Sequence, residues 1–169
     1  MTELFTEVPA TRGKELGLWA RRVIVALLVV VAALALWGVF GQSDRESTVT
    51  ANGVTMTVSS PDVVRGGLYF QAAVDITSTV AVEHPRLVLD DGWVEGLQVN
   101  SIEPAAESET SRDGRVVLSY GALEPGDRLK VWLQFQVDPT KPGARPHGIE
   151  LDDETRALVR VDRDLKVLP

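Results

Sequence analysis

The stretch "LKVWLQFQV", residues 129–137, decides the fold class of this chain. Apolar and polar side chains alternate along it, and the apolar frame consists of Leu129, Val131, Leu133, Phe135 and Val137. Such alternation is typical of a half-buried β-strand, because successive side chains leave opposite faces of a sheet. Trp132 is the exception, since this large aromatic residue stands in the polar frame. We therefore expect Trp132 to be either a binding residue on the outside of a sheet or a side chain that a neighbouring segment covers.

A second signal, near the N-terminus, predicts a membrane-spanning helix at residues 23–40. The run "VIVALLVVVAALALWGVF" contains neither a charged residue nor a proline. As a helix it is roughly 27 Å long, close to the ~30 Å hydrocarbon core of a bilayer. Trp19 and Trp37 lie near its ends, where interfacial aromatic residues anchor a helix. A cleaved signal peptide is the competing interpretation, but the run exceeds the usual ~7–15 apolar residues of such peptides. We expect a retained anchor.

Flanking basic residues predict the orientation of this helix. Those on its N-terminal side are Arg12, Lys14, Arg21 and Arg22, whereas only Arg45 follows closely. Because basic residues favour the cytoplasmic side, residues 1–22 are predicted to be cytoplasmic and the C-terminal part extracytoplasmic, at a plasma membrane. The run holds no ionisable residue, so we expect an anchor in the lipid bilayer and no ion pathway.

The remainder of the chain is predicted to be a short linker, residues 41–46, followed by one domain, residues 47–169. Fully extended, the linker spans at most ~20 Å. Four of the 17 Lys/Arg and three of the 24 Asp/Glu precede residue 42, which leaves 13 and 21 and a net charge of −8 beyond it. This balance argues against nucleic acid as a partner, since phosphate binding depends on basic clusters. The chain has no cysteine, which excludes disulfides and thiolate metal sites.

The domain reads as strands separated by turns. Asn52-Gly53 between alternating runs is a strong hairpin signal. Further turn signals are "DDG" at 90–92, "SRDG" at 111–114 and "EPGD" at 124–127. The C-terminal segment predicts a closing hairpin around "DDET", with Ala157, Val159, Val161, Leu165 and Val167 in one frame. Eight or nine strands without a helix predict an all-β domain, an antiparallel immunoglobulin-like β-sandwich preceded by one transmembrane α-helix. A small closed barrel is the alternative.

At "LEPGDRLKVWLQFQV", residues 123–137, the sequence resembles the CARDB-like and other conserved-repeat immunoglobulin-like domains of extracellular bacterial proteins. The whole arrangement is also similar to small actinobacterial proteins with one N-terminal span and one exported β-domain. The resemblance implies a surface module for adhesion or assembly, with no catalytic residues to carry over. This chain holds one domain where such domains commonly occur in several copies, so a stalk or spacer role is not implied.

The pattern of histidines and serines favours no catalytic activity. His84 and His147 each adjoin a proline in an expected loop, and no serine lies in a GxSxG pattern. The histidines also lack the HExxH spacing of zinc enzymes. We therefore expect a protein that is not an enzyme and that has no catalytic residues and no cofactor.

Two acidic loops are weak calcium candidates: Asp90 with Asp91, and Asp152 with Asp153 and Glu154. Calcium takes six to eight oxygen ligands, which neighbouring loops of a sandwich can supply. Neither loop has the alternating acidic spacing of an EF-hand. Aspartate is also a preferred turn residue, because its carboxylate accepts hydrogen bonds from nearby backbone amides. We favour this turn interpretation and expect no metal.

Three aromatic residues are the candidate partner- or ligand-binding residues: Trp132, Tyr69 and Trp93. If their strands share a sheet, Trp132 and Tyr69 form a flat patch suited to a partner protein or a sugar ring. Alternatively, the proline-rich segment 138–148 covers them. The sequence thus predicts a membrane-anchored, non-catalytic interaction module or accessory subunit that binds another membrane or envelope protein. The alternative is a surface domain that binds cell-envelope carbohydrate or calcium.

Overall fold

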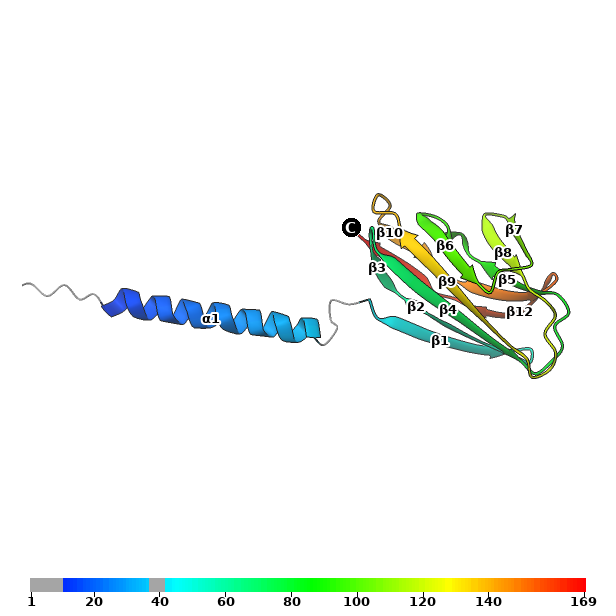
Figure 1. The fold of residues 1–169 in the computed structure, drawn as a ribbon, viewed down its shortest axis with the longest axis horizontal. Coiled ribbons are helices and arrows are strands. Elements are labelled where there is room, and N and C mark those ends of the chain that lie inside the picture. The colour runs from blue at the N-terminus through cyan, green and yellow to red at the C-terminus, as the bar shows by residue number, and fades with distance from the viewer. Residues whose placement is uncertain (1–10, 37–41) are drawn as a thin grey trace, which may run out of the picture. The chain divides into compact units, whose positions relative to one another are not determined.

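The computed structural model describes residues 11–36 and 42–169, and the chain divides into two compact units, Met1–Gly41 and Gln42–Pro169. The first unit contains helix α1, Thr11–Leu36 (Figure 1). Its segment Gly17–Leu34 is long and apolar enough to cross a membrane, and a signal sequence can have the same length and composition. The helix begins before the predicted span because the preceding residues 14–22 are mostly good helix formers. Trp37 and the predicted end of the span lie outside the described residues.

Residues 42–169 form a sandwich of two five-stranded antiparallel sheets (Figure 1). Sheet 1 has the order β1 (Asp44–Ala51), β2 (Val54–Pro61), β4 (Tyr69–Ser78), β9 (Arg128–Val137) and β6 (Leu97–Glu103). Sheet 2 has the order β12 (Arg156–Val161), β11 (Ile149–Asp153), β5 (Pro85–Leu89), β8 (Arg115–Ser119) and β7 (Ser108–Arg112). The predicted sandwich is therefore confirmed over a closed barrel.

The core lies between these sheets and follows the predicted alternation. On β9 the buried side chains are Val131, Leu133, Phe135 and Val137, and on β4 they include Phe70, Val74 and Ile76. Sheet 2 contributes Leu87, Leu118 and Leu151 from the opposite side. Between β1 and β2, Asn52 and Gly53 both have positive φ, 51° and 79°, as the predicted two-residue hairpin requires.

The C-terminal segment departs from the predicted closing hairpin. β11 and β12 do form a hairpin, but a register shift at Leu151/Asp152 leaves Ala157 exposed. The last strand, β13 (Asp164–Leu168), joins neither large sheet. It pairs with β10 (Gly143–Pro146) and, in parallel, with β3 (Val63–Arg65). Alternation correctly identified the buried face of β13 but did not specify the strands that pair with it, and short pairings of this kind raise the strand count of the described residues to thirteen.

The first strand also begins earlier than predicted. β1 starts at Asp44, inside the expected linker 41–46, because its ladder with β2 runs without interruption from Asp44 opposite Pro61 to Ala51 opposite Val54. In addition, the guanidinium of Arg163 donates a hydrogen bond to the carbonyl of Arg45 at 2.7 Å. These contacts make residues 44–46 part of the domain.

Candidate functional site

The solvent-facing side of sheet 1, which we call the outer face, is the candidate functional surface. The register between strands places the following side chains on it: Glu46, Thr48 and Thr50 of β1, Thr55, Thr57 and Ser59 of β2, Tyr69, Gln71, Ala73, Asp75 and Thr77 of β4, Arg128, Lys130, Trp132, Gln134 and Gln136 of β9, and Gln98, Ser101 and Glu103 of β6. Most of these are neutral and polar. They form a surface of threonine, glutamine and two aromatic side chains.

Trp132 lies on the outer face, as its place in the polar frame predicted. It is opposite Ala73 on β4 and Glu103 on β6, and 39% of it is exposed. The ammonium nitrogen of Lys130 stands 4.3 Å from the ring centroid, a cation–π contact. The strand of segment 138–148, β10, pairs instead with β13 in the small sheet. Trp132 is thus partly shielded by a lysine of its own strand, and the rest of the indole faces solvent.

Tyr69 stands on the same face but not beside Trp132. It lies opposite Gln136, whereas Trp132 lies opposite Ala73, four positions further along β4 and so about 13 Å away. The predicted continuous aromatic patch is therefore not formed. Tyr69 is 64% exposed, and the paired amides Gln71 and Gln134 occupy the row between the two aromatic residues.

Two shallow hollows flank this glutamine-rich part of the outer face. One, of about 360 Å³, is lined by Tyr69, Phe70, Gln71, Gln134 and Phe135. The other, of about 380 Å³, lies on the other side of Gln136 and is lined by Gly96, Leu97, Gln98, Gln136, Val137, Asp138, Pro139 and Lys141. Carboxamides thus line both hollows, and the first hollow contains no residue that is charged at neutral pH.

Trp93 belongs to the core, so its prediction as a surface binding residue is wrong. The 3₁₀ turn Asp91–Trp93 directs its side chain into the sandwich, where it is fully buried. The indole N–H donates to the carbonyl of Gly148 at 3.1 Å, and the ring stacks on His147 with 3.3 Å between centroids. Trp93 follows the turn signal "DDG", residues 90–92, and this signal does not reveal in which direction the turn points the next side chain.

The two histidines do not share a site. His147 is buried, and neither ring nitrogen has a hydrogen-bond partner among the described residues. Burial lowers its pKa to about 3, helped by the charges of Arg163 and Arg145. His147 is therefore neutral at physiological pH. His84 is exposed, and its backbone N–H donates to Asp153.

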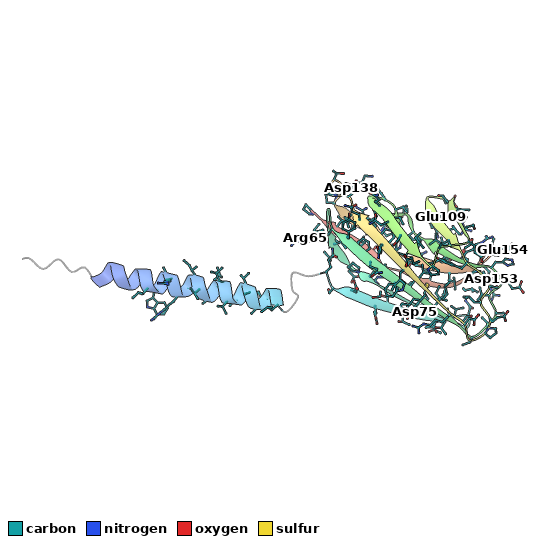
Figure 2. All side chains as sticks on the ribbon, viewed as in Figure 1. Arg65, Asp75, Glu109, Asp138, Asp153 and Glu154 are labelled. Carbon is teal, nitrogen blue, oxygen red and sulfur yellow. The ribbon has the colours of Figure 1, made fainter. Side chains whose placement is uncertain are left out.

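The acidic loops do not combine into one ligand set. Asp90 follows β5 beside Ile149, whereas Asp152 and Asp153 lie at the other end of β11, opposite Arg86 and Pro85. Figure 2 shows Asp153 together with Glu154 at that end of the sandwich. Among the residues that the structure describes, no three His, Cys, Asp or Glu side chains gather as a metal site would require.

Several of these carboxylates already form ion pairs with arginines or accept a hydrogen bond from the backbone. Asp90 is 2.7 Å from Arg160 and Asp152 is 3.4 Å from Arg112. Burial raises the pKa of Asp152, the negative charge of Glu150 adds to this, and Arg112 opposes it. Asp91 is exposed at the 3₁₀ turn, and Glu154 has φ 58° in the β11–β12 turn. Asp90 and Asp152 thus take part in ion pairs, which the turn interpretation did not include.

The outward side of sheet 2 differs from the outer face of sheet 1. Arg160 contacts Asp90, Glu150 and Asp162, and Arg115 contacts Glu150. On the same side of the sheet, the apolar Val88 is almost fully buried. Because these charges are already paired with one another, this surface offers fewer free groups to a partner than the outer face does.

No family model matches the sequence, and no curated protein matches it. Among solved structures, the chain is similar to the CARDB domain of a Pyrococcus furiosus protein in solution, with 13% identity over 71% of this chain and 98% of that domain and a TM-score of 0.44. A crystal structure of that domain with two metal ions is 14% identical over 72% and 97%, with a TM-score of 0.44. CaCohA2 from Clostridium acetobutylicum is 12% identical over 75% and 91%, with a TM-score of 0.41. The similarity to CARDB-like, immunoglobulin-like β-domains concerns the fold alone.

Proposed function

We propose that this chain is a membrane-anchored, extracytoplasmic, non-catalytic interaction module, an accessory subunit that binds another membrane or envelope protein through the outer face. The apolar part of helix α1 supports retention in the bilayer, and Arg21 and Arg22, on the N-terminal side of its charge-free run, support a cytoplasmic N-terminus. An anchored domain meets neighbouring membrane proteins at a raised effective concentration, so such a protein is the natural partner.

The observation that carries this proposal is the exposure of two large aromatic residues on one face of a sheet. Trp and Tyr are enriched among the residues that dominate binding energy at protein interfaces. Tyr69 faces solvent with most of its ring, and Trp132 does so beside Lys130. Neutral glutamine and threonine side chains around them can be buried with their hydrogen bonds satisfied by a partner's backbone.

A second function is favoured by the two hollows: binding of an uncharged cell-envelope carbohydrate. Sugar rings stack on exposed aromatic faces, and carboxamides can both donate and accept hydrogen bonds with hydroxyl groups. Tyr69 with Gln71 and Gln134 offers both kinds of group in one hollow. Calcium is the less supported ligand, because the acidic loops lie at opposite ends of β11.

Photo-crosslinking in living cells tests the proposed function. A photoreactive residue replaces Trp132 or Tyr69 in the full-length chain, and matched probes replace the exposed residues Thr110 and Ser111 of β7 in sheet 2. We expect one discrete crosslinked protein from the outer-face probes and none from the β7 probes. Equal crosslinking from both sheets would contradict the proposal. Crosslinking to glycan alone would favour the carbohydrate function.

A further inference from the structure

The free edges of the two large sheets are not equally protected. An edge strand exposes unpaired backbone amides and carbonyls, and proteins commonly block such edges with bulges, charges or short strands. β6 carries a register shift between Val99 and Ser101, and the β11–β12 ladder carries one at Leu151/Asp152. β12 also bears Arg156 and Arg160, and β7 has only five residues, including Glu109 and Arg112. Each of these three edges therefore has a protective feature.

β1 has none of these features along most of its length. Its eight residues pair with β2 without any register shift, and residues 47–51, "STVTA", are uncharged and rich in β-branched side chains. Figure 1 shows β1 at the margin of its sheet. A regular edge strand with an uncharged stretch, here residues 47–51, is a template on which another strand can add.

Val49 indicates what such a strand should cover. It lies opposite Met56, which is fully buried, so Val49 belongs to the core side of sheet 1. Nevertheless 37% of Val49 is exposed, because no further strand follows β1. Strand β12 of the other sheet packs near β1, but no strand is hydrogen-bonded to its outer edge, and Val49 stays partly exposed there.

We propose that β1 pairs antiparallel with β1 of a second copy of this chain, in a register centred on Val49, so that the two copies share one continuous ten-stranded sheet. This interface lies at the edge of the sheet and goes beyond the partner surface of the outer face. A two-fold axis through the sheet requires paired residues to lie on the same face, which restricts the register to a few choices.

The Val49-centred register is self-complementary. It places Val49 against Val49 of the second copy, Thr48 against Thr50, and Ser47 against Ala51, so apolar meets apolar on the core side and threonine meets threonine outside. No charged residue then faces a like charge. A register centred on Ser47 would instead place Arg45 against Val49 and lose the apolar contact. This self-matching sequence favours a second copy over an unrelated strand, and a shared membrane concentrates the copies.

Cysteine crosslinking tests the inference, because the chain has no native cysteine. Directly opposed residues of antiparallel strands have Cα atoms about 4.5–5.5 Å apart, within disulfide range. The variant Val49→Cys is made in the full-length chain and treated with a mild oxidant in isolated membranes. Val99→Cys is the matched control, since Val99 is 40% exposed on the core side of the other edge of sheet 1.

We expect Val49→Cys to give a reducible band of twice the 18.4 kDa chain mass, and Val99→Cys to stay monomeric. Wild-type chain in mild detergent should also run as a dimer by native mass spectrometry, and Thr48→Lys should convert it to a monomer. A monomeric wild type, equal crosslinking of both variants, or a Val49→Cys adduct with a different protein would each overturn the inference. The outer-face probes report separately on the other partner, so failure of one proposal leaves the other measurable.

Discussion

Two tryptophans of this domain show how burial, and not residue type, sets the role of a side chain. Trp93 is enclosed by His147 and Phe135 and donates to a buried carbonyl, whereas Trp132 rests on the surface under Lys130. The first contributes to stability and the second is available for recognition. Substitutions at these two positions therefore test the stability of the domain and the proposed recognition role separately.

We expect Trp93→Ala to lower the free energy of unfolding by about 3–5 kcal/mol, the usual cost of emptying a large buried aromatic site. Trp132→Ala should cost less than about 1 kcal/mol, because it loses only partial burial and one exposed cation–π contact. Urea unfolding of the compact unit 42–169 measures both. Similar losses for the two variants would mean that Trp132 is a structural residue.

His147 makes the stability of the domain depend on pH. Its native pKa is about 3, whereas an unfolded histidine titrates near its ordinary value of 6.5. Between pH 3 and pH 6.5, the unfolded state binds more protons at this histidine than the folded state does. The contribution of the neutral His147 to the free energy of unfolding is therefore fully present above about pH 6.5 and decreases as the pH falls towards 3. The slope approaches about 1.4 kcal/mol per pH unit.

The variant His147→Gln should flatten this part of the stability profile, since glutamine does not titrate. Urea unfolding at pH 4, 5, 6 and 7 compares the variant with wild type, and His84→Gln, altered at an exposed position, serves as the control. Parallel profiles for wild type and His147→Gln would show that other groups set the acid sensitivity, such as Asp62 and Asp75, whose pKa values are lowered in the folded state by hydrogen bonds from arginines.

At the scale of the elements, one arginine joins β1 and β2 to the segment between β12 and β13. The Arg163 side chain is 4% exposed and donates to the carbonyls of Arg45, Val58 and Ser60 and to the carboxylate of Asp62. Burial opposes ionisation of Asp62, yet hydrogen bonds from Arg163 and Arg45 hold its pKa below the ordinary value. Arg163 therefore has a structural role: its hydrogen bonds hold these segments of the domain together.

Arg163→Met should lower the free energy of unfolding by on the order of 3 kcal/mol, because buried acceptors lose their donor. Arg128→Met is the matched control, since Arg128 also pairs with a carboxylate, that of Asp75, but on the exposed outer face. Exposed pairs contribute at most about 1 kcal/mol. Equal losses of unfolding free energy for Arg163→Met and Arg128→Met, measured in urea, would argue against this structural role of Arg163.

The strands show which parts of the structure could be predicted from the sequence. Period-two alternation assigned β9 and β4 their buried and exposed faces, and hence the outward position of Trp132 and Tyr69. Alternation carries no information on which strand lies beside which. The pairing of β13 with β3 and the distance between Tyr69 and Trp132 along the sheet were therefore found only in the structure.

Trp93 and His147 illustrate a second limit of sequence reasoning. Their stacking joins a 3₁₀ turn after β5 to the residue before Gly148, and Gly148 accepts the indole hydrogen bond. Neither segment shows an alternation of apolar and polar residues from which an inward-pointing side chain could be predicted. The one local clue is Gly92, where a Cβ would overlap the carbonyl of Pro146, so close packing of this turn requires glycine.

For the whole molecule, the decisive question is whether the apolar helix α1 stays attached to the β-domain. An interaction module in the membrane requires retention, whereas cleavage after a signal sequence would release residues 42–169 or a slightly longer fragment. Signal peptides carry a short apolar region followed by a small-residue site, and here Ala33-Leu34-Ala35 lies inside the apolar run.

We expect the full-length chain to remain in the membrane pellet after alkaline carbonate extraction, with an intact mass of 18.4 kDa. A control chain that starts at residue 42 should appear in the soluble fraction, because the β-domain holds its own core and carries no apolar span. Protease added to intact cells should remove the β-domain of the full-length chain and leave the N-terminal segment protected. A soluble product with the mass of a chain that begins after Ala35 would contradict retention. The proposed accessory subunit would then be a secreted protein.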